Sequence, residues 1–369
     1  MKNLTKEREI PSSKFWNGKK VLITGHTGFK GSWLALWLLK LGAKVSGISL
    51  IPEKKQNLFD YLELSKNLNH NILDIRNKDE LTKSIKKIKP DIVFHLAAQP
   101  LVLNSYKEPI LTWETNVNGT LNVLYSLQCL DDRCGAIFIT TDKVYKNKEW
   151  IFGYRENDLL GGIDPYSSSK AASEIAIASW RESFCGSLPY QKSNLYIASA
   201  RSGNVIGGGD WSNNRIVPDI VRSLSSNKKI IIRNPSSTRP WQHVLDPLSG
   251  YLLLAERLYS EGDNFASAFN FGPNTESNKT VLELVEESLK LWSGSYEISN
   301  SKNSPHEAGM LNLSIEKSFN KLKWRPKWDF YKTINVTISW YKMLLECKSS
   351  PLEMCINNIS DYENDKIID

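Results

Sequence analysis

A glycine-rich segment, Gly25–Gly31 (GHTGFKG), directly follows the apolar run VLIT at 21–24. The order of apolar strand, tight glycine turn and helix is typical of the phosphate-binding opening of a dinucleotide-binding fold. The first glycine permits the turn, the second lets the backbone approach a pyrophosphate, and the third lets the helix close on the sheet. The helix N-terminus then faces the phosphate charge. An ordinary tight turn is the alternative. We predict dinucleotide contacts from Gly25, Thr27, Gly28, Phe29 and Gly31.

Apolar strand-like runs alternate with helical segments along the first half of the chain. These runs lie at 21–24, 45–50, 71–75, 92–96, 136–140 and 195–201. Strands that are apolar throughout indicate a parallel sheet buried on both faces. The fold class predicted is therefore α/β, a doubly wound parallel sheet, here over 15–203. The irregular segment GNVIGGGDWSNNR then opens a smaller mixed substrate lobe, 204–348, some of which can return to the sheet and which ends in a helix near 334–345.

The two ends of the chain are expected to be extensions of the fold, and its composition and charge argue against several classes of protein. Residues 1–14 and 349–369 are expected to be extensions, with the polar last ten residues loose. The net charge of +7 is spread along the chain, which favours an ordinary solvated surface over a nucleic-acid site. No signal peptide or membrane-spanning run is evident, so a cytoplasmic location is expected. Five dispersed cysteines and five dispersed histidines predict neither a disulfide framework nor a metal site.

A tyrosine and a lysine four residues apart, Tyr166 and Lys170, lie in the helix-like segment DPYSSSKAASEIA. This spacing puts both on one helix face, where an ammonium can lower the pKa of a phenol so that it accepts a hydroxyl proton. The pair Tyr362 and Lys366 in the tail has the same spacing and is considered incidental. Tyr166 gains weight because it follows ITTDKVY, in which a strand delivers polar residues at its C-terminal end. Open α/β sheets keep their chemistry at that end.

The chain resembles the extended short-chain dehydrogenase/reductases, and among them the sugar-nucleotide 4,6-dehydratases that act on CDP-glucose. The resemblance covers the chain from about residue 15 to 340. Its most specific stretches are TTDKVY, DPYSSSKA, RSGNVIGGGDW and RPWQHV. It implies NAD as cofactor, CDP-glucose as substrate, a homodimer or homotetramer, and a role in deoxysugar biosynthesis. Such enzymes pair through the helix that carries Tyr166 and the segment near Trp113.

The resemblance also assigns roles to residues. It implies a reaction in which the sugar's C4 is oxidised, water is eliminated across C5 and C6, and the hydride returns at C6. Tyr166 and Lys170 would form the oxidoreductase pair, Thr141 would hydrogen-bond the 4-hydroxyl, and Asp142 is the candidate acid for the leaving 6-hydroxyl. For the cofactor, it implies contacts from Asp74, Ile75, Ala97, Ala98 and Gln99. Two bland alternatives remain, that Asp74 caps the helix beginning near 77 and that Thr141 satisfies a backbone group.

The second predicted strand departs from the common pattern. The acidic residue that usually reads the adenine ribose is absent from GISLIP at 47–52, where Ser49 is the remaining hydrogen-bonding candidate. Lys54 and Lys55 follow and leave NADP open, although the resemblance favours NAD.

Lys143 is the second unusual residue, because related dehydratases that act on thymidine sugars carry a glutamate there as the C5 base. A lysine can accept a proton only when it is neutral. The alternatives are that Lys143 is the base, that it stays charged and stabilises the enolate, or that it pairs with Glu149 or Glu156.

The substrate residues predicted are Asn204, Arg215, Arg239, His243 and Asn270. Arg239 is the favoured diphosphate ligand because RPWQHV places it beside Trp241 and His243, with Arg215 second. The two asparagines are equally compatible with turns, and Arg257 reads as a surface charge. Trp33 and Trp37 share a helix face expected to lie in the core or an interface. A 4-epimerase, a reductase or a non-catalytic NAD-binding regulator remain alternative functions.

Overall fold

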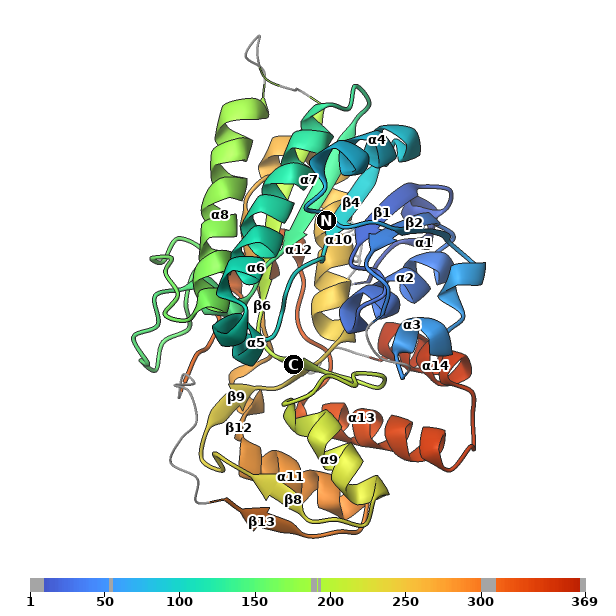
Figure 1. The fold of residues 1–369 in the computed structure, drawn as a ribbon, viewed down its shortest axis with the longest axis vertical. Helices are drawn as coiled ribbons and strands as arrows, with labels where there is room; N and C mark the ends of the chain where they lie inside the picture. Colours follow the sequence, from blue (N-terminus) through green and yellow to red (C-terminus); the bar gives the residue numbers. More distant parts are fainter. Residues whose placement is uncertain (1–9, 53–55, 187–190, 192–193, 300–309, 366–369) are drawn as a thin grey trace, which may run out of the picture.

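A seven-stranded parallel sheet is the centre of the molecule. The computed structural model describes residues 10–52, 56–186, 191, 194–299 and 310–365. The strand order is β11-β6-β5-β4-β1-β2-β3, and every neighbouring pair is parallel (Figure 1). The strands are β1 (Lys20–Thr24), β2 (Lys44–Ser49), β3 (Asn69–Ile72), β4 (Ile92–His95), β5 (Cys134–Ile139), β6 (Leu195–Ser202) and β11 (Ala268–Phe271).

The strands are buried on both faces, as their apolar composition predicts. In β1, Val21 and Ile23 belong to one core cluster while Leu22 belongs to the cluster on the opposite face. β4 and β5 are buried along their whole length. The strand order reverses between β1 and β4, so the carboxyl ends of these two strands form a topological switch point, where ligands of open α/β sheets bind.

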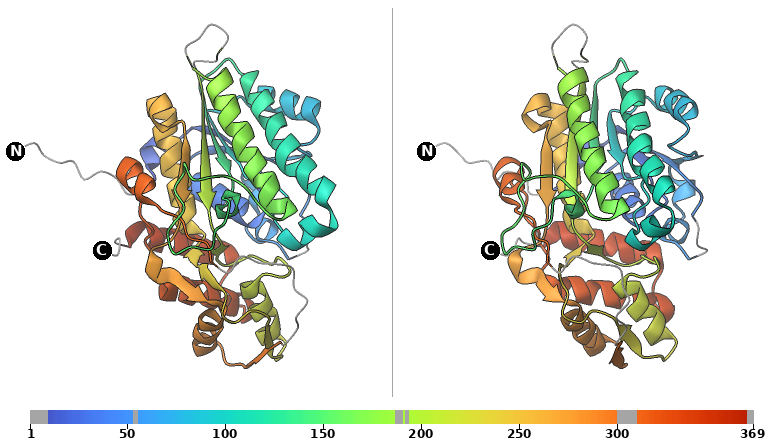
Figure 2. Two further views of the ribbon diagram at one scale, coloured as in Figure 1. Left: turned by 90° about the vertical axis from the view of Figure 1, so that its left-hand side faces the viewer. Right: turned by 60° about the vertical axis from the view of Figure 1, so that its left-hand side comes forward.

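Helices cover both faces of the sheet (Figure 2). One face packs against α4, α7 and α8, whose buried residues include Leu81, Val123 and Ile177. The other face packs against α2 and α10. Trp33 and Trp37 of α2 are fully buried there, which confirms the core alternative for these residues. The α-helices that precede β6 in the sequence are α1 (Ser13–Trp16), α2 (Phe29–Lys40), α3 (Leu58–Tyr61), α4 (Lys78–Ile88), α5 (Val102–Lys107), α6 (Pro109–Trp113), α7 (Gly119–Gln128) and α8 (Pro165–Phe184).

Residues after 203 build a lower lobe and also return to the sheet. α10 and β11 pack on or join the seven-stranded sheet. The lower lobe in Figure 1 contains α9, α11 and α13 with the small sheets β8–β13 and β9–β12. The elements are α9 (Ile216–Ser225), α10 (Leu245–Glu261), α11 (Val281–Leu291), α12 (Glu316–Leu322), α13 (Phe330–Leu345), α14 (Pro351–Asn364), β7 (Val205–Ile206), β8 (Ile230–Ile232), β9 (Thr238–Pro240), β10 (Gln242–His243), β12 (Asn278–Thr280) and β13 (Tyr296–Ile298).

Two expectations about element boundaries are wrong. The third strand runs over 69–72 instead of 71–75, because the apolar residues after 72 leave the sheet and lead into α4. The last ten residues are not loose up to residue 364, since α14 packs against α2 and α13. Tyr362 is fully buried and donates to Asp246 Oδ1 at 2.8 Å, whereas Lys366 lies outside the described residues.

Candidate active site

The glycine turn lies at the carboxyl end of β1 and leads directly into α2. Gly25 has φ +79°, and a Cβ there would lie 2.7 Å from the backbone nitrogen of Ala97. A Cβ on Gly31 would lie 2.1 Å from the carbonyl oxygen of Gly25, so this glycine lets the helix close on the turn. Gly28 is exposed at the N-cap of α2, and Phe29 is half-buried. The turn is therefore an open cradle of backbone N–H groups at a helix N-terminus, which fits a pyrophosphate.

The residues predicted at the adenine end lie next to this turn. The hydroxyls of Thr27 and Ser49 hydrogen-bond each other at 2.7 Å. Asp74 accepts from Arg76 through both carboxylate oxygens, and these bonds with Arg76 outweigh burial and hold the pKa of Asp74 below its usual range. The helix-cap alternative for Asp74 is wrong, because the side chain of Asn77 caps α4.

The loop after β4 places Ala97, Ala98 and Gln99 beside the glycine turn. The side chain of Gln99 is not directed to a ligand, since it bonds Thr112 at 2.9 Å and both backbone groups of Leu101. This corrects the expectation for that side chain and leaves its backbone as the possible contact. Asn116, in a π-helical turn (η2, Glu114–Asn118), accepts from the Gln99 N–H at 2.8 Å and donates to Ser169 Oγ at 2.9 Å. Asn116 therefore joins the loop 97–99 to α8, a link that no sequence spacing showed.

Tyr166 and Lys170 lie on the first turns of α8, which begins as predicted at Pro165. Asp164 and Ser167 form a capping box there. Both residues of the pair are buried, and Lys170 Nζ donates to the carbonyl of Ile139 at 3.3 Å. Burial raises the pKa of Tyr166 to about 12, although its hydrogen bond with Thr141 lowers it. The pKa of Tyr166 is therefore raised, whereas the spacing to Lys170 predicts that it is lowered. Burial also lowers the pKa of Lys170 to about 8.

Thr141, Asp142 and Lys143 follow β5 at the same edge of the sheet. Thr141 caps the short helix η3 (Asp142–Val144) by accepting from Lys143 N, and it also donates to Asp142 Oδ1 at 2.9 Å. The backbone alternative for Thr141 thus describes only part of its bonding. Lys143 Nζ donates to Asp142 Oδ1 at 3.1 Å and to Asn204 Oδ1 at 3.1 Å.

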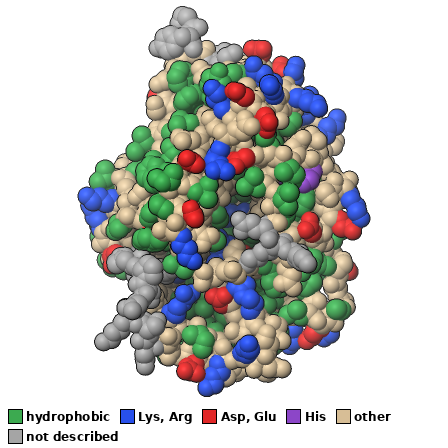
Figure 3. Space-filling model, in the orientation of Figure 1, with side chains coloured by type: hydrophobic (Ala, Val, Ile, Leu, Met, Phe, Trp, Pro, Cys, Tyr) green, Lys and Arg blue, Asp and Glu red, His purple; other side chains and the backbone are tan. Residues whose placement is uncertain are grey.

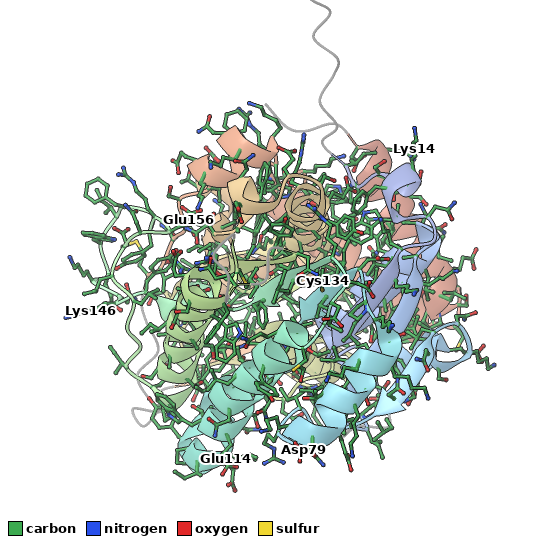
Figure 4. The ribbon with its side chains drawn as sticks, turned by 90° about the horizontal axis from the view of Figure 1, so that it is seen from above. Lys14, Asp79, Glu114, Cys134, Lys146 and Glu156 are labelled. Atoms are coloured by element: carbon green, nitrogen blue, oxygen red, sulfur yellow. The ribbon has the colours of Figure 1, made fainter. Side chains whose placement is uncertain are left out.

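The alternative that Lys143 pairs with Glu149 or Glu156 is wrong, because Lys143 pairs with Asp142. Glu156 instead accepts from the Asn270 N–H at 2.9 Å. Figure 4 shows Glu156 farther in than Lys146, which lies at the outer edge of the same loop. The carboxylate of Asp142 is 4% exposed and the Lys143 side chain 29%, so the lysine is the more accessible partner.

A buried ion pair lies behind this group. Glu174, one turn after Lys170, bonds Arg201 at 2.8 Å, Thr140 at 2.5 Å and Ser199 at 2.8 Å. Burial acts to raise the pKa of Glu174, but the charge of Arg201 and these bonds hold it below its usual range. Glu174 therefore holds Thr140, the residue before Thr141, against α8. The sequence offered a signal for it, because positions 166, 170 and 174 form one stripe on the helix.

Arg215, at the N-cap of α9, pairs with the buried Asp210 at 2.8 Å and acts electrostatically on Tyr166. Asn204 accepts a hydrogen bond from the Lys143 ammonium, so Asn204 belongs to the group around Asp142. Arg239 lies half-buried on β9 and donates to the carbonyl of Thr238 at 2.8 Å. Arg257 pairs with Glu261 on the surface of α10, which confirms the expectation for it.

Two predicted substrate ligands lie in the core instead. His243 is fully buried, with its ring 4.7 Å from that of Trp328, and its Nδ1 accepts from Leu245 N. Burial lowers its pKa to about 3. Asn270 is also fully buried, and its amide accepts from Tyr145 and donates to the carbonyls of Tyr154 and Ser314. β10 runs through the interior, so the ring of His243 packs against the rings of Trp33 and Trp328.

Trp241, the third member of the predicted grouping, is also buried, and its indole N–H donates to the carbonyl of Lys279 at 2.9 Å. Arg239 is the member of that grouping whose side chain is not buried. Within the described ranges, no group of three His, Cys, Asp or Glu side chains is arranged to hold a metal ion. No helix in the same residues is long and apolar enough to cross a bilayer. Figure 3 shows acidic and basic side chains interspersed over one face.

Solved structures share this fold. A dTDP-glucose 4,6-dehydratase from Bacillus anthracis, in complex with NAD, superimposes with a TM-score of 0.72 at 23% identity, covering 88% of this chain and 97% of that one. A UDP-glucose 4-epimerase from Thermus thermophilus, also in complex with NAD, gives a TM-score of 0.75 at 22% identity, covering 87% and 98%. The predicted fold class is thereby confirmed.

Proteins similar in sequence show the family to which the chain belongs. A CDP-glucose 4,6-dehydratase from Salmonella typhimurium is 45% identical over 350 residues, which cover 94% of this chain and 97% of that protein. A CDP-paratose 2-epimerase from Salmonella typhi is 27% identical over 84% of this chain and 95% of its own length. The model of the GDP-mannose 4,6 dehydratase family matches residues 22–337. With this match and the Salmonella typhimurium relative aligned to almost its whole length, the chain belongs to the GDP-mannose 4,6 dehydratase family.

Proposed function

We propose that this chain is an NAD-dependent lyase that converts CDP-glucose to CDP-4-dehydro-6-deoxyglucose and water. One observation carries the proposal: the Asp142 carboxylate accepts from both Thr141 and Lys143, next to Tyr166. A 4-epimerase or reductase needs the Tyr166–Lys170 pair alone, whereas loss of the 6-hydroxyl also needs an acid and a base beside it. The Salmonella typhimurium relative, named for this activity, supports the substrate.

The glycine turn, Ser49, Asp74 and the backbone of 97–99 would hold NAD, because together they form the cradle described above. When bound, NAD⁺ would supply the hydride acceptor for oxidation at C4 and, once reduced, the hydride donor for C6. Ser49 is matched to a ribose hydroxyl, because its own hydroxyl can donate or accept a hydrogen bond. Lys54 and Lys55, the pair considered for NADP, lie outside the described residues.

Tyr166 would remove the proton of the 4-hydroxyl while Thr141 orients that hydroxyl. The phenol holds its proton firmly in the protein alone, since burial raises its pKa to about 12. A nearby positive charge stabilises the tyrosinate that forms when the phenol loses its proton, and Lys170 and Arg215 would supply that charge. Arg215 acts to lower the pKa of Tyr166, although burial and the charge of Asp142 act to raise it. Glu174 keeps α8 and β5 in register while this occurs.

Asp142 and Lys143 would carry out the elimination as a pair. Moving one proton along their 3.1 Å hydrogen bond turns the ion pair into a carboxylic acid and a neutral amine. The amine then takes the C5 proton and the acid protonates the leaving 6-hydroxyl. Loss of water leaves Lys143 charged and Asp142 ionised, so the pair returns to its starting state.

The lower lobe would bind the diphosphate through Arg239 and Arg215, because a guanidinium matches phosphate oxygens in geometry and charge. Asn204 would lie near the sugar, since its side chain contacts Lys143. We also propose a homodimer or homotetramer in the cytoplasm. Large apolar side chains are exposed on the neighbouring helices α5, α6 and α8, namely Tyr106, Ile110, Trp113 and Ile175.

The test is to incubate the purified protein with CDP-glucose and to follow the ultraviolet absorbance that a 4-keto sugar develops in alkali. UDP-glucose, dTDP-glucose and GDP-mannose serve as competing substrates. We expect the keto sugar from CDP-glucose at a kcat/KM at least about tenfold higher than from the others. A product that is an epimer of the substrate, without loss of water, would identify an epimerase instead.

A further inference from the structure

Lys30 is a polar residue of the glycine segment to which no role has been given so far. It lies in the first turn of α2 and is half-buried. Its ammonium donates to the hydroxyl of Ser202 at 2.8 Å, and Ser202 shares a second hydrogen bond of 2.7 Å with the hydroxyl of Tyr251. Lys30 therefore connects the helix of the cofactor turn to the end of β6, 172 residues away in sequence.

The residues after Ser202 contact the Asp142–Lys143 pair. A Cβ on Gly203 would lie 3.1 Å from Asp142 Oδ2, so the backbone of this glycine lies against the carboxylate. Asn204 is the second acceptor of the Lys143 ammonium, at 3.1 Å. The turn 202–204 thus forms one wall around the acid and base, and Lys30 holds the first residue of that wall.

The position of Lys30 is electrostatically unfavourable. Burial lowers its pKa to about 7, and Arg215, Lys170 and Lys143 add to this effect, while Asp142 opposes it. The other groups at its ammonium, Ser202 and Tyr251, are neutral hydroxyls. An amine crowded by three cations does not favour folding. Residues that break a local rule in this way are concentrated at functional sites.

We propose that Lys30 is a positioning residue for the elimination of water: it holds the turn 202–204 so that Gly203 and Asn204 keep Asp142 and Lys143 in hydrogen-bonding geometry. The inference rests on the proposed function for its kinetic consequence. It concerns the second half of the reaction, because Tyr166, Lys170 and Thr141 make no hydrogen bond with Lys30 or Ser202 among those found in the described residues.

The kinetic test compares Lys30→Met, Ser202→Ala and the double variant in single turnovers with CDP-glucose. We expect the rise of NADH absorbance to stay within about threefold of the unaltered protein and its decay to slow about 10- to 100-fold, the scale of a misplacement of about 1 Å. The double variant should be no slower than either single variant, since both break one contact. Lys317→Met is the matched control, because Lys317 also donates to a serine, Ser267, at 3.0 Å and lies outside the site.

Two kinetic results would overturn the proposal. One is an unchanged decay of NADH in Lys30→Met. The other is slow decay in Lys30→Met with normal decay in Ser202→Ala, which would mean that the charge acts without the contact. Ser202→Ala retains the lysine and carries the test alone if Lys30→Met does not fold.

A crystal structure of Ser202→Ala or Lys30→Met separates this inference from the proposed function. We expect the Lys143 Nζ to Asn204 Oδ1 separation to increase beyond hydrogen-bonding distance. An unmoved turn would refute the positioning role, whatever the substrate. If the unaltered protein forms no NADH with CDP-glucose while the turn moves in the variants, the proposed function fails and the positioning role stands.

Discussion

Two polar segments of this chain look alike in sequence but are used differently. The segment 141–143 follows a buried strand, and its side chains meet Tyr166 and Asn204 at the carboxyl edge of the sheet. The segment 239–243 joins two short strands, and its Trp241 and His243 are buried among the core aromatics. A polar or aromatic residue therefore has a functional meaning only with its place in the layers. The end of a parallel strand opens to the site, whereas β10 lies between packed helices.

Tyr166→Phe tests the functional side of this comparison and has the largest expected effect. Removal of the phenolic hydroxyl should lower kcat with CDP-glucose about a thousandfold or more, because it removes the acid–base group. NAD affinity, measured by calorimetry, should not change. Tyr362→Phe, in the incidental tail pair, is the control and should leave kcat unaltered. Near-normal turnover in Tyr166→Phe would remove this residue from the mechanism.

Arg239→Ala asks whether the second segment contributes anything to the substrate. We expect CDP-glucose to bind about 1.5 to 3 kcal/mol more weakly, the scale of a hydrogen bond to a charged group, with NAD affinity unchanged. Calorimetric titration gives both affinities, and Arg257→Ala provides a surface control. If substrate affinity stays the same, the diphosphate role passes to Arg215 and the whole segment is structural.

His243→Asn sharpens the structural side and has the smallest expected effect. The pKa of His243 is about 3 in the fold and about 6.5 when unfolded, so below pH 6.5 the unfolded chain binds a proton that the folded chain does not. This histidine therefore removes stability progressively as the pH falls from 6.5 towards 3. Asparagine keeps an acceptor for Leu245 N but has no such titration.

Denaturant unfolding at pH 7 and pH 5 should show that His243→Asn loses about 1 to 2 kcal/mol less than the unaltered protein on acidification. Equal losses in the two proteins would mean that His243 is accessible to protons, and would restore it as a candidate ligand.

The sheet and the glycine turn could be predicted from sequence because both depend on local patterns. The run at 21–24 and the glycines at 25 and 31 have backbone or packing requirements that neighbouring residues reveal. The start of α8 at Pro165 follows local rules too. Tyr166 and Asp142 could be proposed because each follows such an element.

The remaining partners could not be predicted, because they are chosen by contacts between distant parts of the chain. Lys30 bonds Ser202, and Asn270 bonds Tyr145, each across more than a hundred residues. The pKa of Tyr166 was expected in the wrong direction because burial, the largest cause of its shift, depends on the whole fold. The ion pair of Glu174 with Arg201 likewise needs α8 to lie beside β6.

The most direct test of the central claim is exchange of the C5 hydrogen with solvent deuterium in Lys143→Met and Asp142→Asn. With CDP-glucose both variants should reduce bound NAD⁺ and stall before losing water, so that NADH absorbance accumulates. We predict that Lys143→Met loses C5 exchange because the base is gone, and that Asp142→Asn loses it too, because an amide cannot take the proton whose transfer makes Lys143 neutral. Exchange at the normal rate in Lys143→Met would show that another group removes the proton, and would contradict the assignment of acid and base to this pair.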